Sequence, residues 1–184
     1  LLGRRKHLVS QLDLRRMDGP LALHAQRRHA AGGSEITVRV VEISERPVDR
    51  AQAEVVRSYL EHRLSGDPSG RIIVLGDLND FEFRPPIETL AAEPMVNLVE
   101  RLPQADRWTY VYQGNSQVLD HIIVSPALAE GAEIEVIHVN ADFPAVRRAS
   151  DHDPVLALDL RGHPVADHQS RRAGAAALPV EPTA

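Results

Sequence analysis

The clearest pattern in the chain is a run of apolar residues that ends abruptly in polar ones. Residues 71–81 read Arg-Ile-Ile-Val-Leu-Gly-Asp-Leu-Asn-Asp-Phe. A short apolar run rich in β-branched residues is typical of a strand buried on both faces, so we predict a central strand here. We expect the side chains of Asp77 and Asn79 to lie on one face at its end. Gly76 would allow the backbone to turn at that point.

Five other segments have the composition or alternation of strands, and they are residues 35–43, 107–112, 118–125, 133–139 and 155–160. Trp108, Tyr110 and Tyr112 alternate along the second of these segments. Aromatic side chains on one face of a strand either stack on a nucleobase or form one side of a core. Residues 113–116, Gln-Gly-Asn-Ser, predict a hairpin turn after which residues 118–124 return along the aromatic strand.

Helical periodicity is clearest in residues 50–64. Apolar residues recur there at spacings of three and four, namely Ala53, Val56, Leu60 and Leu64. This spacing predicts an amphipathic helix that begins after Asp49, ends at the Ser-Gly-Asp-Pro of residues 65–68, and packs behind the central strand. Shorter helices are predicted from the Arg-Pro-Pro-Ile of residues 84–87 to about Ala92, and over residues 97–102.

The composition excludes several classes of protein. The 184 residues are 43% hydrophobic and 26% charged, contain no cysteine, and include no apolar run long enough to cross a membrane. A disulfide framework and a thiolate metal site are therefore impossible.

Charge is distributed unevenly within a net charge of −5. Residues 1–40 contain 8 Lys/Arg against 3 Asp/Glu, and the remainder contains 13 against 23. A basic head is either a phosphate-binding arm or a disordered or mis-assigned stretch. Because residues 14–33 show neither helical nor strand periodicity, we predict the second for residues 1–45. Residues 163–184, rich in Ala, Pro, Arg and His, are predicted to be a disordered tail.

Two further strands carry polar motifs. Residues 118–125 read Val-Leu-Asp-His-Ile-Ile-Val-Ser, and residues 150–155 read Ser-Asp-His-Asp-Pro-Val. With the Gly-Asp-Leu-Asn of residues 76–79, these motifs resemble in order the C-terminal half of the endonuclease/exonuclease/phosphatase superfamily, the deoxyribonuclease-I-like, magnesium-dependent phosphodiesterases. The resemblance covers residues 46–160 and extends to Gln52-Ala53, Asn-Asp-Phe and Thr109-Tyr110, as in large bacterial, often secreted, nuclease-like members.

The resemblance implies an α/β (α+β) fold that is part of a four-layer α/β/β/α sandwich with its N-terminal half largely missing. The domain would occupy residues 46–162. The family's main metal-binding glutamate and the asparagine before it belong to that missing half. We therefore interpret the chain, which begins at Leu1 rather than Met, as a fragment whose sheet exposes an apolar face.

Phosphodiester hydrolysis requires an activated water and a cation that neutralises the phosphoryl oxygens. The resemblance implies that Asp120 and His152 form a dyad in which the histidine is the general base. Asp77 and Asn79 would orient the nucleophile and bind phosphoryl oxygens. Asp151, together with Asp77, would complete an oxygen-ligand site for Mg²⁺, with Mn²⁺ or Ca²⁺ as alternatives.

For three other polar residues the sequence leaves open whether they bind phosphate, and for two more it predicts a structural role. His7, in Lys-His-Leu-Val-Ser, resembles a family histidine that contacts the scissile phosphate, and is otherwise a solvent-exposed histidine in a basic tail. Arg147 and Arg148 either bind a phosphate backbone or are surface charges on a mobile loop. His121 should face the opposite side of its strand and be structural, and Asp153 should be a turn acceptor.

The chain is therefore predicted to be a divalent-metal-dependent phosphodiester hydrolase, and in the first instance a nuclease. One alternative is a catalytically silent fragment that at most binds nucleic acid. Another is a phosphoesterase that acts on a phosphoinositide, a sphingomyelin or a nucleotide, because the motifs are shared across these substrates.

Overall fold

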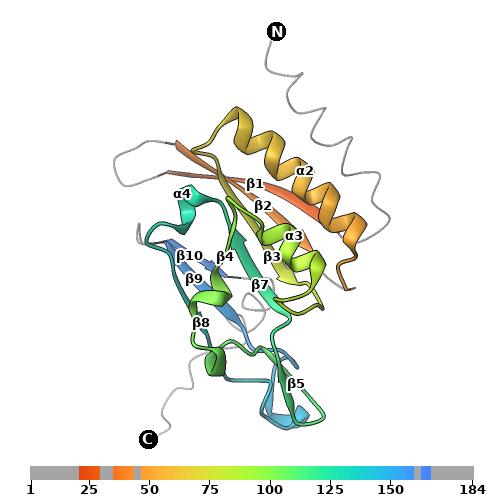
Figure 1. Cartoon of the computed structure of the whole chain (residues 1–184). Helices are drawn as coiled ribbons and strands as arrows, with labels where there is room; N and C mark the ends of the chain where they lie inside the picture. The colour runs from red at the N-terminus through yellow and green to blue at the C-terminus, as the bar shows by residue number, and fades with distance from the viewer. Residues whose placement is uncertain (1–20, 30–34, 44–46, 160–162, 167–184) are drawn as a thin grey trace, which may run out of the picture.

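The computed structural model describes residues 21–29, 35–43, 47–159 and 163–166 (Figure 1). In chain order the elements are β1 (Leu21–His29), β2 (Glu35–Ile43), α2 (Arg50–Gly66), β3 (Arg71–Asp77), α3 (Pro85–Ala91), β4 (Val96–Asn97), the 3₁₀ turns η1 (Leu98–Arg101) and η2 (Gln104–Asp106), β5 (Tyr110–Tyr112), β6 (Asn115–Gln117), β7 (Asp120–Val124), α4 (Pro126–Ala129), β8 (Glu133–Val136), η3 (Ala145–Arg147), β9 (Val155–Asp159) and β10 (His163–Ala166).

Two sheets and a hairpin account for the strands. The larger sheet has the order β1-β2-β3-β7-β4, and only β2 and β3 within it are parallel. The smaller sheet has the order β10-β9-β8, and β5 pairs with β6. Helices α2 and α3 cover one face of the larger sheet, while β8 and β9 pack on its other face. The described residues thus form an α/β/β arrangement, and the fourth layer of the predicted sandwich is not among them.

Helix α2 packs as its sequence predicts. Its four buried residues are Ala53, Val56, Leu60 and Leu64, which join one core cluster with Ile72 and Val74 of β3. At its first turn, Asp49 accepts a hydrogen bond from the Gln52 backbone N–H (2.8 Å), and the Gln52 side chain accepts one from the Asp49 N–H (3.2 Å). This reciprocal cap satisfies two backbone donors that a helix start leaves open. None of the helices in the described part of the chain has the length and apolar character needed to cross a bilayer.

The opposite face of the sheet is also buried, and the prediction of an exposed apolar face is wrong for the described strands. Ile73 of β3 and Ile122 of β7 are 2% and 0% exposed. They pack against Val136 of β8 and Val155 and Ala157 of β9. The smaller sheet therefore shields this face from water, so β3 and β7 are buried on both sides.

One prediction about pairing needs correction. Strand β1, within the head predicted to be disordered or mis-assigned, pairs with β2, and β10, at the start of the predicted tail, pairs with β9. The aromatic strand β5 was expected to pair with residues 118–124, but its partner is β6. All five residues of β7 are buried, so this strand lies inside the larger sheet, between β3 and β4. Strand composition does not specify which partner supplies the backbone hydrogen bonds.

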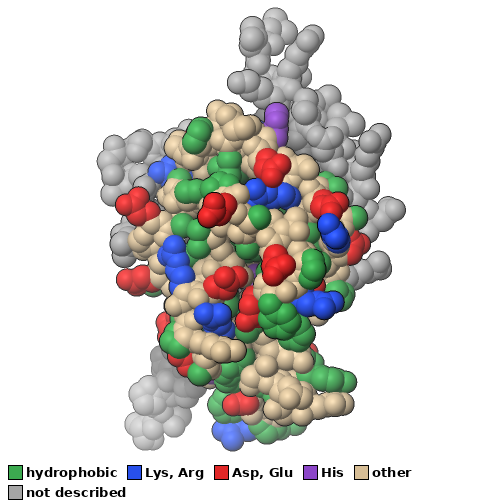
Figure 2. All heavy atoms as spheres, in the orientation of Figure 1, with side chains coloured by type: hydrophobic (Ala, Val, Ile, Leu, Met, Phe, Trp, Pro, Cys, Tyr) green, Lys and Arg blue, Asp and Glu red, His purple; other side chains and the backbone are tan. Residues whose placement is uncertain are grey.

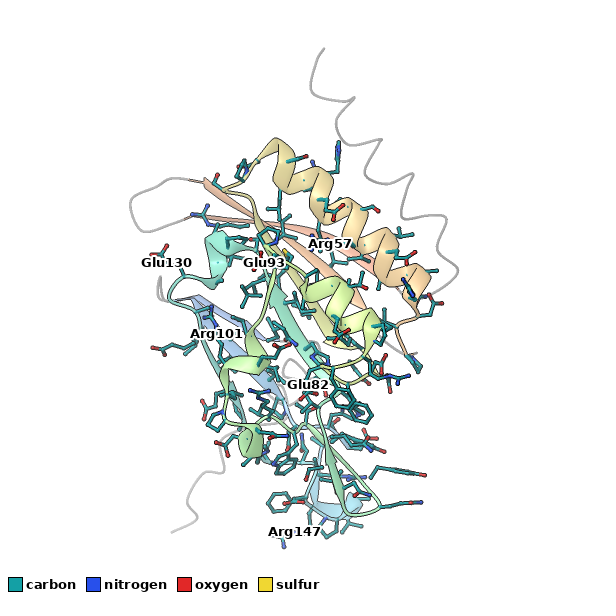
Figure 3. The ribbon with its side chains drawn as sticks, viewed as in Figure 1. Arg57, Glu82, Glu93, Arg101, Glu130 and Arg147 are labelled. Carbon is teal, nitrogen blue, oxygen red and sulfur yellow. The ribbon has the colours of Figure 1, made fainter. Side chains whose placement is uncertain are left out.

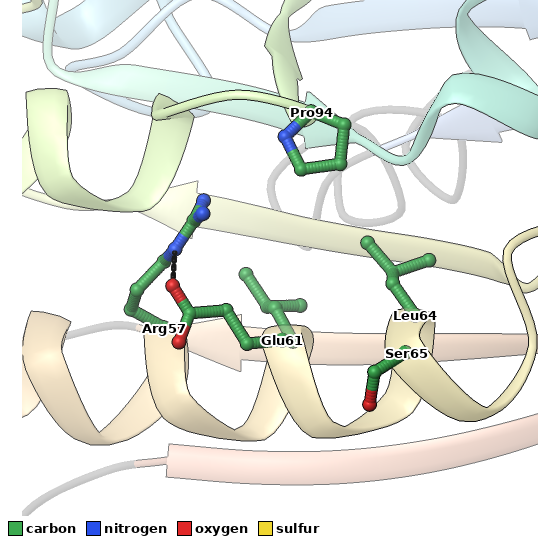
Figure 4. A pocket seen from close by; sticks show the side chains of 6 residues that line it. Arg57, Glu61, Leu64, Ser65 and Pro94 are labelled. Atoms are coloured by element: carbon green, nitrogen blue, oxygen red, sulfur yellow. Dashed lines mark hydrogen bonds and ion pairs between the residues drawn. The ribbon is translucent and has the colours of Figure 1, made fainter.

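A shallow pocket lies between α2 and the turn after α3 (Figure 4). It is lined by Arg57, Leu60, Glu61, Leu64, Ser65 and Pro94. Arg57 pairs with Glu61 (2.7 Å) and donates hydrogen bonds to the carbonyls of Ala92 and Glu93 (2.5 and 2.7 Å). The arginine thus ties α2 to the end of α3. None of the candidate site residues lines this pocket.

Gly76 occupies a backbone conformation that residues with a Cβ rarely adopt, because its φ is +141°. We expect Gly76→Ala to lower the free energy of unfolding by about 1–3 kcal/mol. The matched control is Gly66→Ala at the end of α2, where an added Cβ meets nothing within 4 Å. Urea unfolding followed by circular dichroism should show a loss for the first variant only. Equal stability of Gly76→Ala and the unmodified protein would contradict the assigned strain.

Candidate functional site

The polar ends of three strands meet at one end of the two-sheet core. Asp77, the last residue of β3, lies directly opposite Asp120, the first residue of β7. His152 approaches both from the segment that leads into β9. One ligand atom from each of these three residues lies within 4.8 Å of the others. The three sequence motifs therefore converge, as the sequence analysis predicts.

The shortest contact in this cluster joins His152 to Asp120. His152 Nδ1 lies 2.7 Å from Asp120 Oδ2, and the two residues are 6% and 1% exposed. Because an ionised carboxylate only accepts hydrogen bonds, Nδ1 carries the proton and Nε2 of the neutral ring is left to accept one. Tyr110 packs on the imidazole with ring centroids 4.6 Å apart. The ring is thus held by a carboxylate at one nitrogen and an aromatic face.

Burial and neighbouring charges shift two pKa values here. Burial alone would lower the pKa of His152, but the hydrogen bond and charge of Asp120, with the charges of Asp77 and Asp151, raise it above its ordinary value. Burial raises the pKa of Asp77 to about 6, and the nearby charge of Asp120 adds to the effect. Two carboxylates and one imidazole therefore share a site where small changes in pH change the net charge.

Asn79 shapes the turn that follows Asp77. Its backbone N–H donates to Asp77 Oδ1 at 3.0 Å, and its φ of +50° lies in the left-handed region that asparagine tolerates better than most residues. The Asp77 side chain remains 19% exposed and lies 3.9 Å from His152 Nε2, measured at Oδ2. Asp77 and Asn79 thus form one local unit, and Asp77 is the more accessible carboxylate of the cluster.

His121 lies outside the cluster, as predicted from strand alternation. The residue is fully buried; its Nε2 donates to the carbonyl of Asp80 (3.0 Å), and its Nδ1 accepts from the Asn97 side chain (3.1 Å). Burial lowers the pKa of His121, so the ring is neutral at neutral pH. It connects β7 and β4 to the turn after Asn79.

Asp153 is the acceptor of a turn, which confirms that prediction. The residue is fully buried, and its Oδ1 accepts hydrogen bonds from the backbone N–H groups of Val139, Asn140 and Ala141 at 2.7–3.0 Å. Its Oδ2 lies 3.0 Å from His138 Nδ1. Asp153 thus fixes the segment after β8 beside the catalytic histidine candidate.

Thr109 is a contributor that the sequence analysis did not assign. Its Oγ1 accepts hydrogen bonds from the backbone N–H groups of Leu119 and Asp120 (3.3 Å each), and its carbonyl accepts one from Asp153 N–H (2.7 Å). The residue is fully buried between the two segments that carry the dyad. The only signal in the sequence was its position beside Tyr110 in the resemblance, which does not reveal these bonds.

The remaining candidate residues lie outside the cluster. Asp151 and Arg147 are exposed, and Arg148 is half-buried. Figure 3 shows Arg147 at the lower end of the molecule, below β5. His7 lies outside the described residues. The roles assigned to these four residues stay predictions.

The donor set suits a divalent cation. Asp120 Oδ1 is buried and has no hydrogen-bond partner among the described residues. Asp77 adds a partly exposed carboxylate, and His152 adds an imidazole. Carboxylate oxygens are preferred ligands of Mg²⁺, Mn²⁺ and Ca²⁺. An unsatisfied buried carboxylate oxygen is the kind of atom that a bound cation would stabilise.

Comparisons with known proteins agree with this arrangement. A family model described as "Endonuclease/Exonuclease/phosphatase family" matches residues 8–152. No match to the chain is found among curated proteins.

Solved structures share the fold at low sequence identity. The APE2 catalytic domain of Xenopus laevis superposes with a TM-score of 0.60 at 16% identity, covering 90% of this chain and 62% of that domain. Truncated TDP2 of Caenorhabditis elegans gives 0.52 at 13% identity, covering 74% and 66%. The mannosyl-6-phosphatase Bt3783 of Bacteroides thetaiotaomicron gives 0.50 at 16%, covering 81% and 59%. The chain thus spans about three fifths of the first of these structures.

Proposed function

Because the chain belongs to the endonuclease/exonuclease/phosphatase family, we propose that it is a divalent-metal-dependent phosphodiester hydrolase that acts on nucleic acid. The observation that carries the proposal is the buried 2.7 Å contact between Asp120 and His152, with Asp77 beside it. A structural ion pair has no need of a second carboxylate at the same point. The arrangement is the one expected of a histidine base held by an aspartate.

In this proposal His152 is the general base. Its neutral Nε2 accepts a proton from a water molecule as the water attacks the phosphorus. Asp120 holds the ring in the correct tautomer and stabilises the imidazolium that forms. Burial of the pair keeps the geometry fixed and strengthens the interaction, because the local dielectric is low. The phosphodiester bond breaks on the side opposite the attacking water.

Asp77 and Asn79 would act on the water and the phosphate. The Asp77 carboxylate is near enough to His152 Nε2 (3.9 Å) to share a water with it, and the Asn79 amide would donate to a phosphoryl oxygen. Asp77 and the unpartnered Oδ1 of Asp120, together with Asp151, would hold the divalent ion, which when bound would neutralise the phosphoryl oxygens and the departing oxygen. His7 would contact the scissile phosphate.

The preference for nucleic acid rests on exposed side chains outside the cluster. Phe83 is 65% exposed and Tyr112 is 52% exposed, and exposed aromatic rings stack on unpaired bases. Arg147 and Arg148 would contact backbone phosphates. Figure 2 shows acidic and basic side chains interspersed over the face in view rather than gathered in one basic groove.

The test is a panel of substrates assayed in Mg²⁺ and again with EDTA. We expect cleavage of single-stranded and plasmid DNA, loss of cleavage in EDTA, and a fall in kcat of about 10²- to 10⁴-fold in Asp120→Asn, because the asparagine no longer holds the required tautomer. Hydrolysis of p-nitrophenyl phosphate alone would replace the proposal with a phosphomonoesterase. Failure of a folded sample on every substrate would favour a catalytically silent fragment.

A further inference from the structure

A second aspartate–histidine pair, Asp153 and His138, lies next to the pair formed by Asp120 and His152. Asp153 follows His152, is fully buried, and lies 3.0 Å from His138 Nδ1 through its Oδ2. The His138 side chain is 32% exposed. A buried carboxylate that already accepts three backbone N–H groups nevertheless has this imidazole as an additional partner.

The two pairs are built alike. Tyr110 packs on His152 with centroids 4.6 Å apart, and Trp108 stacks on His138 at 3.9 Å with an interplanar angle of 15°. The two aromatic residues are two positions apart in the segment that ends in β5, the spacing at which side chains share a face of an extended chain. The aromatic alternation seen in the sequence therefore supports two imidazoles, and only Tyr112 of the three rings is exposed.

Hydrogen bonds connect the second pair to the backbone of His152. Asp153 Oδ1 holds the Asn140 N–H at 2.7 Å, and the Asn140 side chain donates to the His152 carbonyl at 2.9 Å. Asp153 N–H also donates to the Thr109 carbonyl (2.7 Å). Asn140 therefore holds the backbone of His152, and the Asp153 carboxylate holds the backbone of Asn140. The position of Asn140 thus depends on the hydrogen bonds of the Asp153 carboxylate.

We propose that His138 is a positioning residue for His152: its hydrogen bond to Asp153 keeps the Asp153–Asn140 frame in the geometry that aims His152 Nε2 at the attacking water. This inference rests on the proposed function for its catalytic consequence, but its structural content does not. Loss of the His138 hydrogen bond leaves Asp153 Oδ2 buried without this donor, which favours rearrangement of the segment that holds the His152 carbonyl.

Two substitutions separate the hydrogen bond from the ring. His138→Phe keeps an aromatic face for Trp108 but has no donor, and His138→Asn places an amide N–H where Nδ1 stood. We expect His138→Phe to lower kcat by about tenfold with KM changed less than twofold, because a small displacement of a catalytic group affects the rate and not substrate binding. His138→Asn should recover most of the loss. Circular dichroism should show both variants folded.

Side-chain nitrogen chemical shifts of the His152 ring, measured by NMR, provide a reading that needs no activity. They should move in His138→Phe and return toward the original values in His138→Asn, while His62→Asn on the surface of α2 leaves them unchanged. The inference would be overturned by unchanged His152 chemical shifts or by an unchanged kcat in His138→Phe. It would also be overturned by an equal loss of kcat in both variants, or by a rise in KM without a change in kcat. An unmodified protein inactive on all phosphoesters would refute the proposed function, and the chemical shifts would still decide the role of His138.

Discussion

His152→Ala is expected to lower kcat for Mg²⁺-dependent DNA cleavage by about 10³-fold while the protein stays folded. The imidazole is the only group in the cluster that can take a proton from water near neutral pH with a carboxylate at its other nitrogen, and a positioned general base contributes about 10²- to 10⁴-fold. Plasmid nicking followed over time gives the rate, and EDTA should abolish the residual cleavage by the alanine variant, because the ion acts independently of the base.

The control for this substitution is His62→Ala. His62 is an exposed histidine on α2, so its loss changes the histidine content without touching the cluster. Its cleavage rate should equal that of the unmodified protein. Undiminished nicking by His152→Ala would show that the cleavage does not use this site, whatever its metal requirement.

Asp77→Asn is expected to stabilise the protein while removing most of its activity. Asp77 lies opposite Asp120 and is largely buried, and both conditions disfavour its charged form. Its pKa of about 6 against an ordinary value of 3.8 corresponds to roughly 1–3 kcal/mol at pH 8, after allowance for its partial exposure. The neutral asparagine avoids this cost and keeps a similar shape, so a rise in Tm with a loss of cleavage is the expected outcome.

The pH dependence of Tm tests the direction of this stability change. Because the pKa of Asp77 is raised in the folded state, the folded protein binds the proton more tightly than the unfolded chain, and ionisation destabilises it as pH rises from 3.8 to about 6. The Tm advantage of Asp77→Asn, measured in EDTA, should therefore grow between pH 5 and pH 8. Asp106→Asn, on an exposed 3₁₀ turn, should show no such growth. A Tm advantage that is the same at both pH values would contradict the assigned cause.

The elements that the sequence predicts well are those whose side chains determine their environment. The unbroken apolar run of residues 72–75 predicts a strand buried on both faces, and the spacing of apolar residues in α2 predicts a helix with one buried side; the structure has both. Strand β1 is different, because its antiparallel pairing with β2 is made through the backbone and leaves no periodicity in the sequence. The prediction of the strand that pairs with β5 was wrong for the same reason.

The candidate site also contains residues that the sequence identifies and residues that it does not. The motifs identify Asp77, Asp120 and His152 because they interrupt apolar strands, and the structure brings these three together. The contacts that hold them in place come from Thr109 and Asn140, whose side chains bond to segments 10 to 12 residues away. A threonine or asparagine in a loop has many ordinary uses in turns, so only the folded arrangement reveals these contacts.

The burial of β3 and β7 on both faces has a further consequence for how the molecule opens. Ile72 and Ile123 belong to the core under α2, while Ile73 and Ile122 belong to the core under β8 and β9. Fluctuations that detach one layer leave the two strands held by the other, so their amide hydrogens should be among the slowest to exchange with solvent. The carboxylates of Asp77 and Asp120 are attached to these strands, so these two carboxylates stay opposite each other through local unfolding of either outer layer. His152 lies on the segment that leads into β9, so its contact with them is lost when the smaller sheet detaches.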